Sequence, residues 1–232
     1  DALPIDRPDV ILNVFPLSAR SGHTPPEELA QEVPDDADSL YWYSQTIGPD
    51  RGLQDVVRAL PHVQATGHRV VLSMRGTWSD GFETTLRGLA RECGVAGHIR
   101  HLPLAPPDQL IERAAEHDVG LALEQPVSTN REICITNKLF AYLLAGLPIV
   151  ATDTPGQHAI CDDLPDASRI CPVGDSSALA SSARSLLDAP DARDQARQAA
   201  DDTYNWEVER TRLLRVFAQT LDMNLKPIST TG

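Results

Sequence analysis

The polar pair Asn137-Lys138 has the residue types and the position that could bind an anion. An apolar run, Leu139–Ala145, follows it as a short buried helix, and after a Gly-Pro break comes a buried strand. Backbone N–H groups at a helix start lack partners and lie at the positive end of the helix dipole. The sequence holds only two lysines, Lys138 and Lys226 in the tail. A helix start with a cation, inside a strand–helix–strand unit, predicts a phosphate site.

Further polar residues occur in or beside the loops that follow the expected strands. Ligands of doubly wound parallel sheets bind beyond the carboxyl ends of the strands. This rule selects five loops: Gln45–Gly52, Arg75–Asp80, Pro103–Pro107, Glu124–Thr136 and Asp153–His158. The candidate polar side chains there are Gln45, Arg51, Arg75, Glu124, Asn130, Arg131, Asn137 and Lys138. Four of them are cations, and local charge decides anion binding even in an acidic protein.

Strands and helices alternate from about residue 40 onward. Apolar runs predict strands over residues 40–44, 69–74, 98–102, 119–123, 147–152 and 168–172. Helical spacing predicts helices over residues 53–60, 81–93, 108–116, 176–187, 191–203 and 206–221, besides the one that begins at Asn137. Strands separated by helices imply an α/β fold, a doubly wound parallel sheet of the Rossmann-like type with flanking helices.

The two ends of the chain differ from the middle. Residues 1–40 hold one strand candidate, Val10–Phe15, and a Pro-rich acidic connector, so we expect a linker and a remnant of a preceding domain. Residues 41–221 form the Rossmann-like domain with its C-terminal helices, and residues 222–232 form a tail. In the last helix Trp206, Leu213, Leu214, Phe217 and Leu221 make one stripe, and we expect Trp206 in the core.

Composition narrows the class of protein. The 232 residues are 41% hydrophobic, which is typical of a globular chain. A net charge of −13 argues against nucleic acid as a partner. No apolar run reaches the roughly 20 residues of a transmembrane segment, and no signal peptide begins the chain, so a cytoplasmic location is expected. The chain starts with Asp, which suggests processing or a longer parent. Its four cysteines form no CxxC pair, so we expect reduced thiols and no zinc site.

Several segments in register resemble the donor-binding, C-terminal domain of GT-B glycosyltransferases of the family-four (group 1) type. The resemblance runs from Ser44 to about Phe217. Its pieces are Ile47–Leu53, Arg75-Gly76, His98–Pro103, His117–Leu121, Asn137–Asp153 and Asn205-Trp206-Glu207. Single pieces are weak, but their common order over some 170 residues is specific.

The resemblance implies transfer of a sugar from a nucleoside diphosphate sugar to a glycan or lipid-linked acceptor, with retention and without an obligatory metal or cofactor. In such a reaction, cations and helix N-termini stabilise the negative charge of the leaving diphosphate. The acceptor binds through an N-terminal domain that this chain lacks, so the chain alone is expected to be inactive. Bacterial polysaccharide assembly is the usual setting. By position, donor and phosphate binding is assigned to Arg51, Lys138, Arg75, Asn137, Gln45 and Gly48; sugar or ribose contacts to Glu124, Asn130, Glu132 and Thr136; and the base-binding turn to Leu102, Pro103 and Leu104.

Three positions depart from the family pattern. The carboxylate that grips the ribose would stand at Ala141. The one near the sugar would stand at Ile133, with Glu132 beside it. One of two basic phosphate ligands is replaced by Gln45 or Thr46. No catalytic residue is assigned, and the sugar, the base and the acceptor stay open.

Each assignment has a simpler alternative. Arg51 would also serve as a solvated helix-start residue, Lys138 as a surface lysine, Arg75 as a partner of nearby carboxylates and Asn137 as an N-cap. His101, His117 and His158 are expected to be structural. At the level of function, the alternatives are a degenerate binding or scaffold module, which Ala141 motivates, and another GT-B enzyme such as a nucleotide-sugar epimerase.

Overall fold

The structure is a computed structural model that describes residues 9–20, 33–34 and 36–225, without the side chains of 222–225. Its centre is one six-stranded sheet in the order β3-β2-β1-β4-β5-β6, and every pair of neighbouring strands is parallel. The strands are β1 Asp38–Ile47, β2 Val70–Trp78, β3 Ile99–Leu102, β4 Val119–Ala122, β5 Ile149–Thr152 and β6 Ser168–Cys171. The predicted Rossmann-like α/β fold is confirmed.

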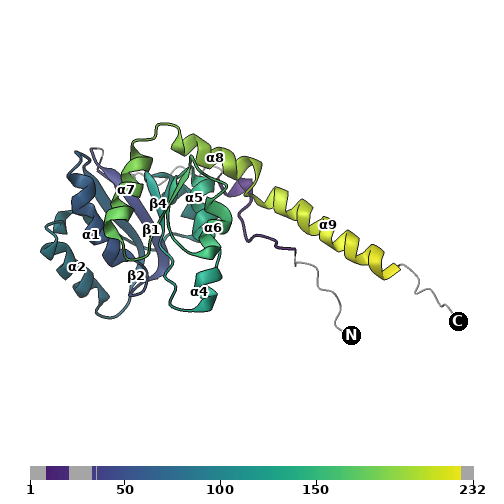
Figure 1. Ribbon diagram of the computed structural model, residues 1–232, viewed down its shortest axis with the longest axis horizontal. Coiled ribbons are helices and arrows are strands. Elements are labelled where there is room, and N and C mark those ends of the chain that lie inside the picture. The colour runs from purple at the N-terminus through teal and green to yellow at the C-terminus, as the bar shows by residue number, and fades with distance from the viewer. Residues whose placement is uncertain (1–8, 21–32, 35, 226–232) are drawn as a thin grey trace.

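Helices cover both faces of the sheet (Figure 1). One face packs against α1 Leu53–Gln64, α2 Phe82–Glu92 and α7 Ser176–Leu187. The other face packs against α3 Leu110–Ala115, α5 Asn137–Ala145, α6 Pro155–Cys161 and α8 Ala192–Asp202. Short helical segments complete this part of the chain: η1 Leu17–Arg20, η3 Ala96–His98, η4 Pro107–Gln109 and α4 Thr129–Ile133. The sequence pattern missed α4 and α6, because five to seven residues are too few to show a helical period.

Helix α5 is the most buried helix of the domain, with every residue from Leu139 to Ala145 in the core. A short helix that is apolar all round is stable only when protein surrounds it. Tyr142 lies against β4 at Gly120, where a Cβ atom would come within 2.4 Å of the tyrosine ring. Its hydroxyl donates to the carbonyls of Tyr41 and Leu121. These contacts fix α5 against β1 and β4, and with it the polar first turn at Asn137.

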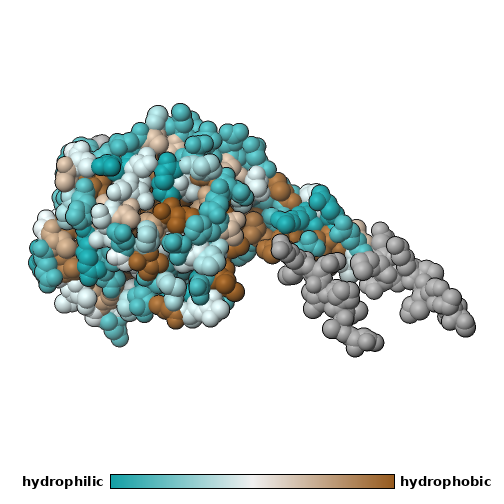
Figure 2. Space-filling view, viewed as in Figure 1, coloured by the Kyte–Doolittle hydropathy of each residue, from teal (hydrophilic) through white to brown (hydrophobic). Residues whose placement is uncertain are grey.

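The last helix, α9 Trp206–Leu225, leaves the body and projects away from it (Figure 1). Its apolar stripe is open, since Leu214, Phe217 and Leu221 are 58%, 58% and 60% exposed. Figure 2 shows hydrophobic residues gathered where α9 leaves the body. The prediction that Trp206 packs in the core is wrong, because its side chain is 38% exposed at the first turn of this projecting helix.

The segment of residues 9–20 runs along the base of α9 rather than joining the sheet. The Leu12 and Leu17 amides donate to Glu209 and Glu207, and the Trp206 amide donates to the Phe15 carbonyl. The prediction of a strand at Val10–Phe15 is therefore wrong, since α9 uses the backbone groups that a strand neighbour would need. Part of the expected connector, including Pro25-Pro26, lies outside the described residues. No helix within the described ranges is long and apolar enough to cross a membrane.

Candidate functional site

A cavity of about 490 Å³ opens at the carboxyl edge of the sheet. It lies next to the point between β1 and β4 where the strand order reverses, which is the usual ligand position in such sheets. The end of β1, the end of β2, the segment after β3 and the start of α5 meet there. Its lining residues are Tyr43, Ser44, Gln45, Arg75, Leu104, Ala105, Pro107, Leu110, Thr136, Asn137 and Lys138.

Two glycines allow the loops at this edge to approach one another closely. Gly76 has φ +150°, and a Cβ atom there would lie 2.4 Å from the carbonyl oxygen of Ser44. Gly52 has φ +71°, and a Cβ atom there would lie 2.8 Å from the Cβ of Leu123. Both positions combine a backbone conformation that favours glycine with the absence of space for a side chain. Strands β1 and β2 therefore lie close together near their carboxyl ends, and the loop after β1 packs against the segment after β4.

Arg75 forms part of the cavity wall and is only 3% exposed. Its Nε donates to the Tyr41 hydroxyl at 2.9 Å, and its Nη1 donates to the Pro103 carbonyl at 2.7 Å. A guanidinium held by two acceptors keeps a fixed direction, which suits recognition of an anion. Arg75 also fixes the predicted turn at Pro103, because it bonds that turn's backbone.

Lys138 lies in the first turn of α5 and lines the cavity. Its Nζ is 3.0 Å from Glu124 Oε1, and the two side chains are 13% and 10% exposed. The ammonium also lies 5.8 Å from the centre of the Trp42 ring. Burial raises the pKa of Glu124, but the charge and hydrogen bond of Lys138, the Thr136 hydrogen bond and the Arg131 charge outweigh burial and lower the pKa overall. The Glu124 carboxylate is therefore ionised and its charge offsets that of Lys138, which is a paired, mostly buried cation rather than a surface lysine.

Part of the cavity lining is apolar. Its apolar residues come from the segment after β3 and the first residue of α3: Leu104, Ala105, Pro107 and Leu110, with Leu104 54% exposed. Tyr43 lies within the second half of β1 and packs edge-on against Tyr142 at 5.6 Å between ring centroids. Burial and then the charge of Tyr41 raise the pKa of the Tyr43 hydroxyl well above its ordinary value, so the phenol stays neutral. The cavity lining thus combines apolar side chains with two cations.

The predicted site residues divide into two groups. The cavity brings together Gln45, Arg75, Leu104, Thr136, Asn137 and Lys138. The other predicted residues are not among its lining residues: Arg51, Gly48, Glu124, Asn130, Glu132, Leu102 and Pro103. Glu124 lies directly behind Lys138. Leu102 is in the core, and Asn130 and Glu132 are exposed on α4. Arg131 of α4 donates to the carbonyl of Asp50, which ties α4 to the loop of Arg51 and Gly48.

Five lining residues were not predicted from the sequence: the aromatic Tyr43, the polar Ser44, and the apolar Ala105, Pro107 and Leu110. The sequence predicts Tyr43 and Ser44 as the last residues of a strand, and β1 in fact continues past them to Ile47 with an irregular register opposite β2. Their place at the predicted strand end was the one sequence feature that could have marked them as lining residues. Ala141, where the family pattern has a carboxylate, is fully buried within α5 and does not line the cavity.

Two of the histidines that were expected to be structural lie close to this site. His117 is 1% exposed, stacks on Tyr41 and bonds Ser39 Oγ through Nδ1 at 2.8 Å. Burial and then the charges of Arg75 and Arg193 lower the pKa of His117 to about 3, so the ring is neutral. His101 bonds the Gly76 carbonyl at 2.7 Å and supports the carboxyl-terminal part of β2. Both contacts are of the structural kind.

Within the described ranges, no group of three or more His, Cys, Asp or Glu side chains is placed to hold a metal ion. The four cysteines are free thiols, and Cys161 and Cys171 are buried. Burial raises the pKa of Cys161 to about 11, which keeps it an unreactive thiol.

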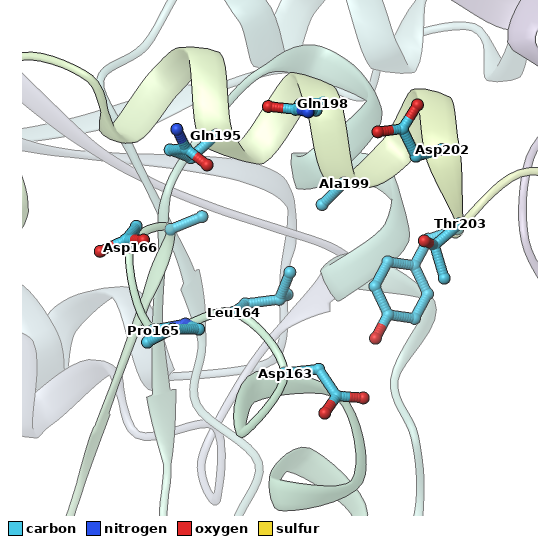
Figure 3. A pocket seen from close by; sticks show the side chains of 11 residues that line it. Asp163, Leu164, Pro165, Asp166, Gln195, Gln198, Ala199, Asp202 and Thr203 are labelled. Carbon is cyan, nitrogen blue, oxygen red and sulfur yellow. The ribbon is translucent and has the colours of Figure 1, made fainter.

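A second cavity, of about 560 Å³, lies at the opposite edge of the sheet (Figure 3). Gln195, Gln198 and Asp202 come from α8, and Asp163 and Asp166 come from the loop before β6. None of these three carboxylates forms an ion pair with another described residue. This cavity has no cation, lies at the amino ends of the strands and is not a candidate for anion binding.

Comparison with known proteins was made by sequence and by structure. No protein-family model and no curated sequence matches the chain. Solved structures do match. HepE of Anabaena, solved with UDP and glucose, superposes with a TM-score of 0.70 at 17% identity over 91% of this chain and 57% of that one. The fold is that of glycosyltransferases.

Two further structures agree with this conclusion. A glycosyltransferase of Rickettsia africae matches with a TM-score of 0.70 at 15% identity, covering 92% of this chain and 57% of that one. Sucrose-phosphate synthase of Thermosynechococcus elongatus matches with a TM-score of 0.62 at 18% identity, covering 90% and 50%. The chain described here spans 37% to 57% of the length of eight structures that it matches.

Proposed function

We propose that this chain is the donor-binding half of a retaining glycosyltransferase of the GT-B, group 1 type. The observation that carries the proposal is the mixed lining of the cavity, in which the cations Arg75 and Lys138 occur together with apolar residues at the carboxyl edge of the sheet. A nucleoside diphosphate sugar has the complementary form, with a flat base at one end and a diphosphate beyond it. The fold likeness to HepE, which binds UDP, supports this direction.

The cations would act on the leaving group. As the bond between sugar and diphosphate breaks, negative charge grows on the phosphate oxygens, and a fixed positive group stabilises that charge. The buried guanidinium of Arg75 is already oriented by Tyr41 and Pro103. The start of α5, with Asn137 and Lys138, adds backbone N–H groups and the positive end of a helix dipole. No metal enters this proposal.

The base and the sugar are assigned to the two ends of the cavity. The base would pack on the apolar part of the wall near Leu104, beside the turn of Leu102 and Pro103. The sugar or ribose would meet Thr136, with Asn130 and Glu132 on α4 as further predicted contacts. Because Ala141 supplies no carboxylate, grip on the ribose hydroxyls would be weaker than in typical members. The acceptor, a glycan or a lipid-linked sugar in polysaccharide assembly, would come through another domain.

The proposal is tested by titrating the chain with UDP, GDP, ADP and dTDP. Calorimetry should show saturable binding of one of the four nucleotides, and the melting temperature of the chain should rise with that nucleotide alone. Transfer activity is not expected until the acceptor-binding domain is supplied. A folded chain that binds none of the four nucleotides would contradict the proposal.

Arg51 is tested separately, because it lies at the same edge but does not line the cavity. If its guanidinium reaches the diphosphate, Arg51→Ala should weaken nucleotide binding by about tenfold or more, equal to about 1.4 kcal/mol. Unchanged affinity would assign Arg51 to the loop alone.

A degenerate binding module is the second candidate, and two observations favour it. Ala141 replaces the usual carboxylate, and Lys138 is already neutralised by Glu124. Such a module would bind no nucleotide. The variant Ala141→Glu would then produce no gain in nucleotide affinity. Because position 141 is buried in α5, the added carboxylate would also lower the stability of the chain. Circular dichroism is therefore needed to check that the variant folds.

A further inference from the structure

The ion pair between Glu124 and Lys138 is built into the wall behind the cavity. Both side chains are nearly buried, and the ammonium is bounded by the Glu124 carboxylate at 3.0 Å and the Trp42 ring at 5.8 Å. Glu124 itself does not line the cavity, whereas Lys138 does. The carboxylate therefore faces the cation from the protein side, and a ligand would face it from the cavity side.

Neighbouring residues hold Glu124 in this position. The Thr152 hydroxyl donates to the Glu124 carbonyl at 2.6 Å. Gln157, which is fully buried, donates through Nε2 to the Thr152 hydroxyl at 2.7 Å and to its carbonyl at 2.9 Å. The Thr136 side chain bonds the carboxylate directly. The backbone of Glu124 is thus fixed by Thr152, and its carboxylate is held by Thr136 and Lys138.

We propose that Glu124 is an internal counter-ion of the site, which neutralises Lys138 when no ligand is bound and competes with an anionic ligand for it. The nature of that ligand, a nucleoside diphosphate, rests on the function proposed above. A nearly buried ammonium without a partner is unfavourable, so Glu124 stabilises the empty site. The same charge repels a diphosphate, so Glu124 also weakens binding and favours release of the product.

This role differs in sign from the one that the family resemblance implies. As a sugar contact, Glu124 would strengthen binding of the sugar nucleotide, and its loss would weaken that binding. If Glu124 only supported the wall of the cavity, its loss would weaken the binding of every ligand. As a counter-ion, its loss strengthens binding of any anion that reaches Lys138.

The variant Glu124→Gln separates these roles, because it removes the charge and keeps the size. The probes are the nucleotide that the unmodified chain binds and inorganic pyrophosphate, both by calorimetry. We expect the unliganded variant to melt at a lower temperature and to bind both probes about tenfold more tightly, the change that corresponds to about 1.4 kcal/mol. Glu92→Gln, an exposed carboxylate on α2, removes the same charge far from Lys138 and should leave both affinities unchanged.

Equal or weaker binding of both probes by a folded Glu124→Gln variant overturns the inference. The gain must also vanish when Lys138→Met is added, since the effect acts through that ammonium. If Glu124→Gln does not fold, Glu124→Asp withdraws the carboxylate by one methylene and should still tighten pyrophosphate binding, and no gain there overturns the inference. If no nucleotide binds but pyrophosphate shows the gain, the counter-ion is supported and the proposed function fails alone.

Discussion

The two cavities of this protein are similar in size and opposite in chemistry. The cavity at the carboxyl edge, about 490 Å³, has Arg75 and Lys138 in its lining, and the one at the amino edge, about 560 Å³, has Asp163, Asp166 and Asp202. The whole chain carries a net charge of −13, so acidic surface is ordinary and a pair of buried cations is not. Size alone therefore says little about which cavity binds a ligand, whereas buried charge says more.

The cations of the first cavity have hydrogen-bond or ion-pair partners in the wall, while the carboxylates of the second cavity have no ion-pair partner among the described residues. Arg75 and Lys138 have fixed partners within the wall, and both are mostly buried. The three aspartates of the second cavity are exposed and form no ion pair with another described residue. If this difference reflects function, substitution of a buried cation in the first cavity should change both stability and ligand binding, and substitution of an aspartate in the second should change neither.

The largest effect is expected from Lys138→Met. This change leaves the Glu124 carboxylate nearly buried without its partner, which should cost about 3 kcal/mol of unfolding free energy. It should also weaken nucleotide binding by about tenfold. Urea unfolding and calorimetry measure the two effects. The matched change Asp166→Asn in the second cavity should stay within about 0.5 kcal/mol; equal losses in both variants would remove the distinction.

A pH effect of the next size is expected from His117, which lies behind Arg75. Its pKa in the folded chain is about 3, below the usual value, so protons bind the unfolded chain preferentially. The contribution of His117 is therefore full above pH about 6.5 and is lost as pH falls toward 3, by up to about 1.4 kcal/mol per pH unit. Urea unfolding between pH 7.5 and 4.5 should show a shallower decline for His117→Gln than for the parent chain. Parallel declines would contradict the low pKa.

Arg75→Lys should have a moderate effect on binding. Lysine keeps the charge but loses the planar fork that contacts Tyr41 and Pro103, so nucleotide affinity should fall by about tenfold. Calorimetry with the preferred nucleotide measures the loss. Asp202→Asn provides the control at the second cavity. Retention of full affinity by Arg75→Lys would show that only charge matters at this wall.

The smallest effect is expected from Leu104→Ser in the apolar part of the wall. The side chain is half-exposed, so the free energy of unfolding should change by less than about 0.5 kcal/mol. Loss of apolar contact with a base should weaken nucleotide binding by about fivefold while leaving pyrophosphate binding unchanged. Competition titrations with UDP and pyrophosphate measure the two affinities separately. An equal loss for both ligands would argue against a base at this wall.

Much of the fold could be predicted from local patterns. The stretch Asn137–Asp153 gave a helix, a Gly-Pro break and a strand, and the structure has α5 and β5 there. Both are continuous apolar runs bounded by turn residues, so their type and burial follow from composition. Strand β1 extends beyond its predicted limits, to Asp38 and Ile47, because its ends pair with neighbours whose position the sequence does not display.

The site could be predicted only in part. Arg75, Asn137 and Lys138 were found because strand ends and helix starts converge at one edge of a parallel sheet. The partnership of Lys138 with Glu124 could not be predicted, since fourteen residues and a loop separate them. The position of Arg51 beside the cavity rather than in it depends on how the loop of Asp50 packs against α4.

By itself, the sequence determined the element order, the parallel sheet and the edge at which a ligand site would lie. Those features follow from periodicity, breakers and the geometry of strand–helix–strand units, which act over short distances along the chain. Tertiary structure alone decided that Trp206 is exposed, that Val10–Phe15 forms no strand and that Lys138 is neutralised. Each depends on which distant surface lies opposite a residue, because burial and charge pairing are properties of contacts rather than of local sequence.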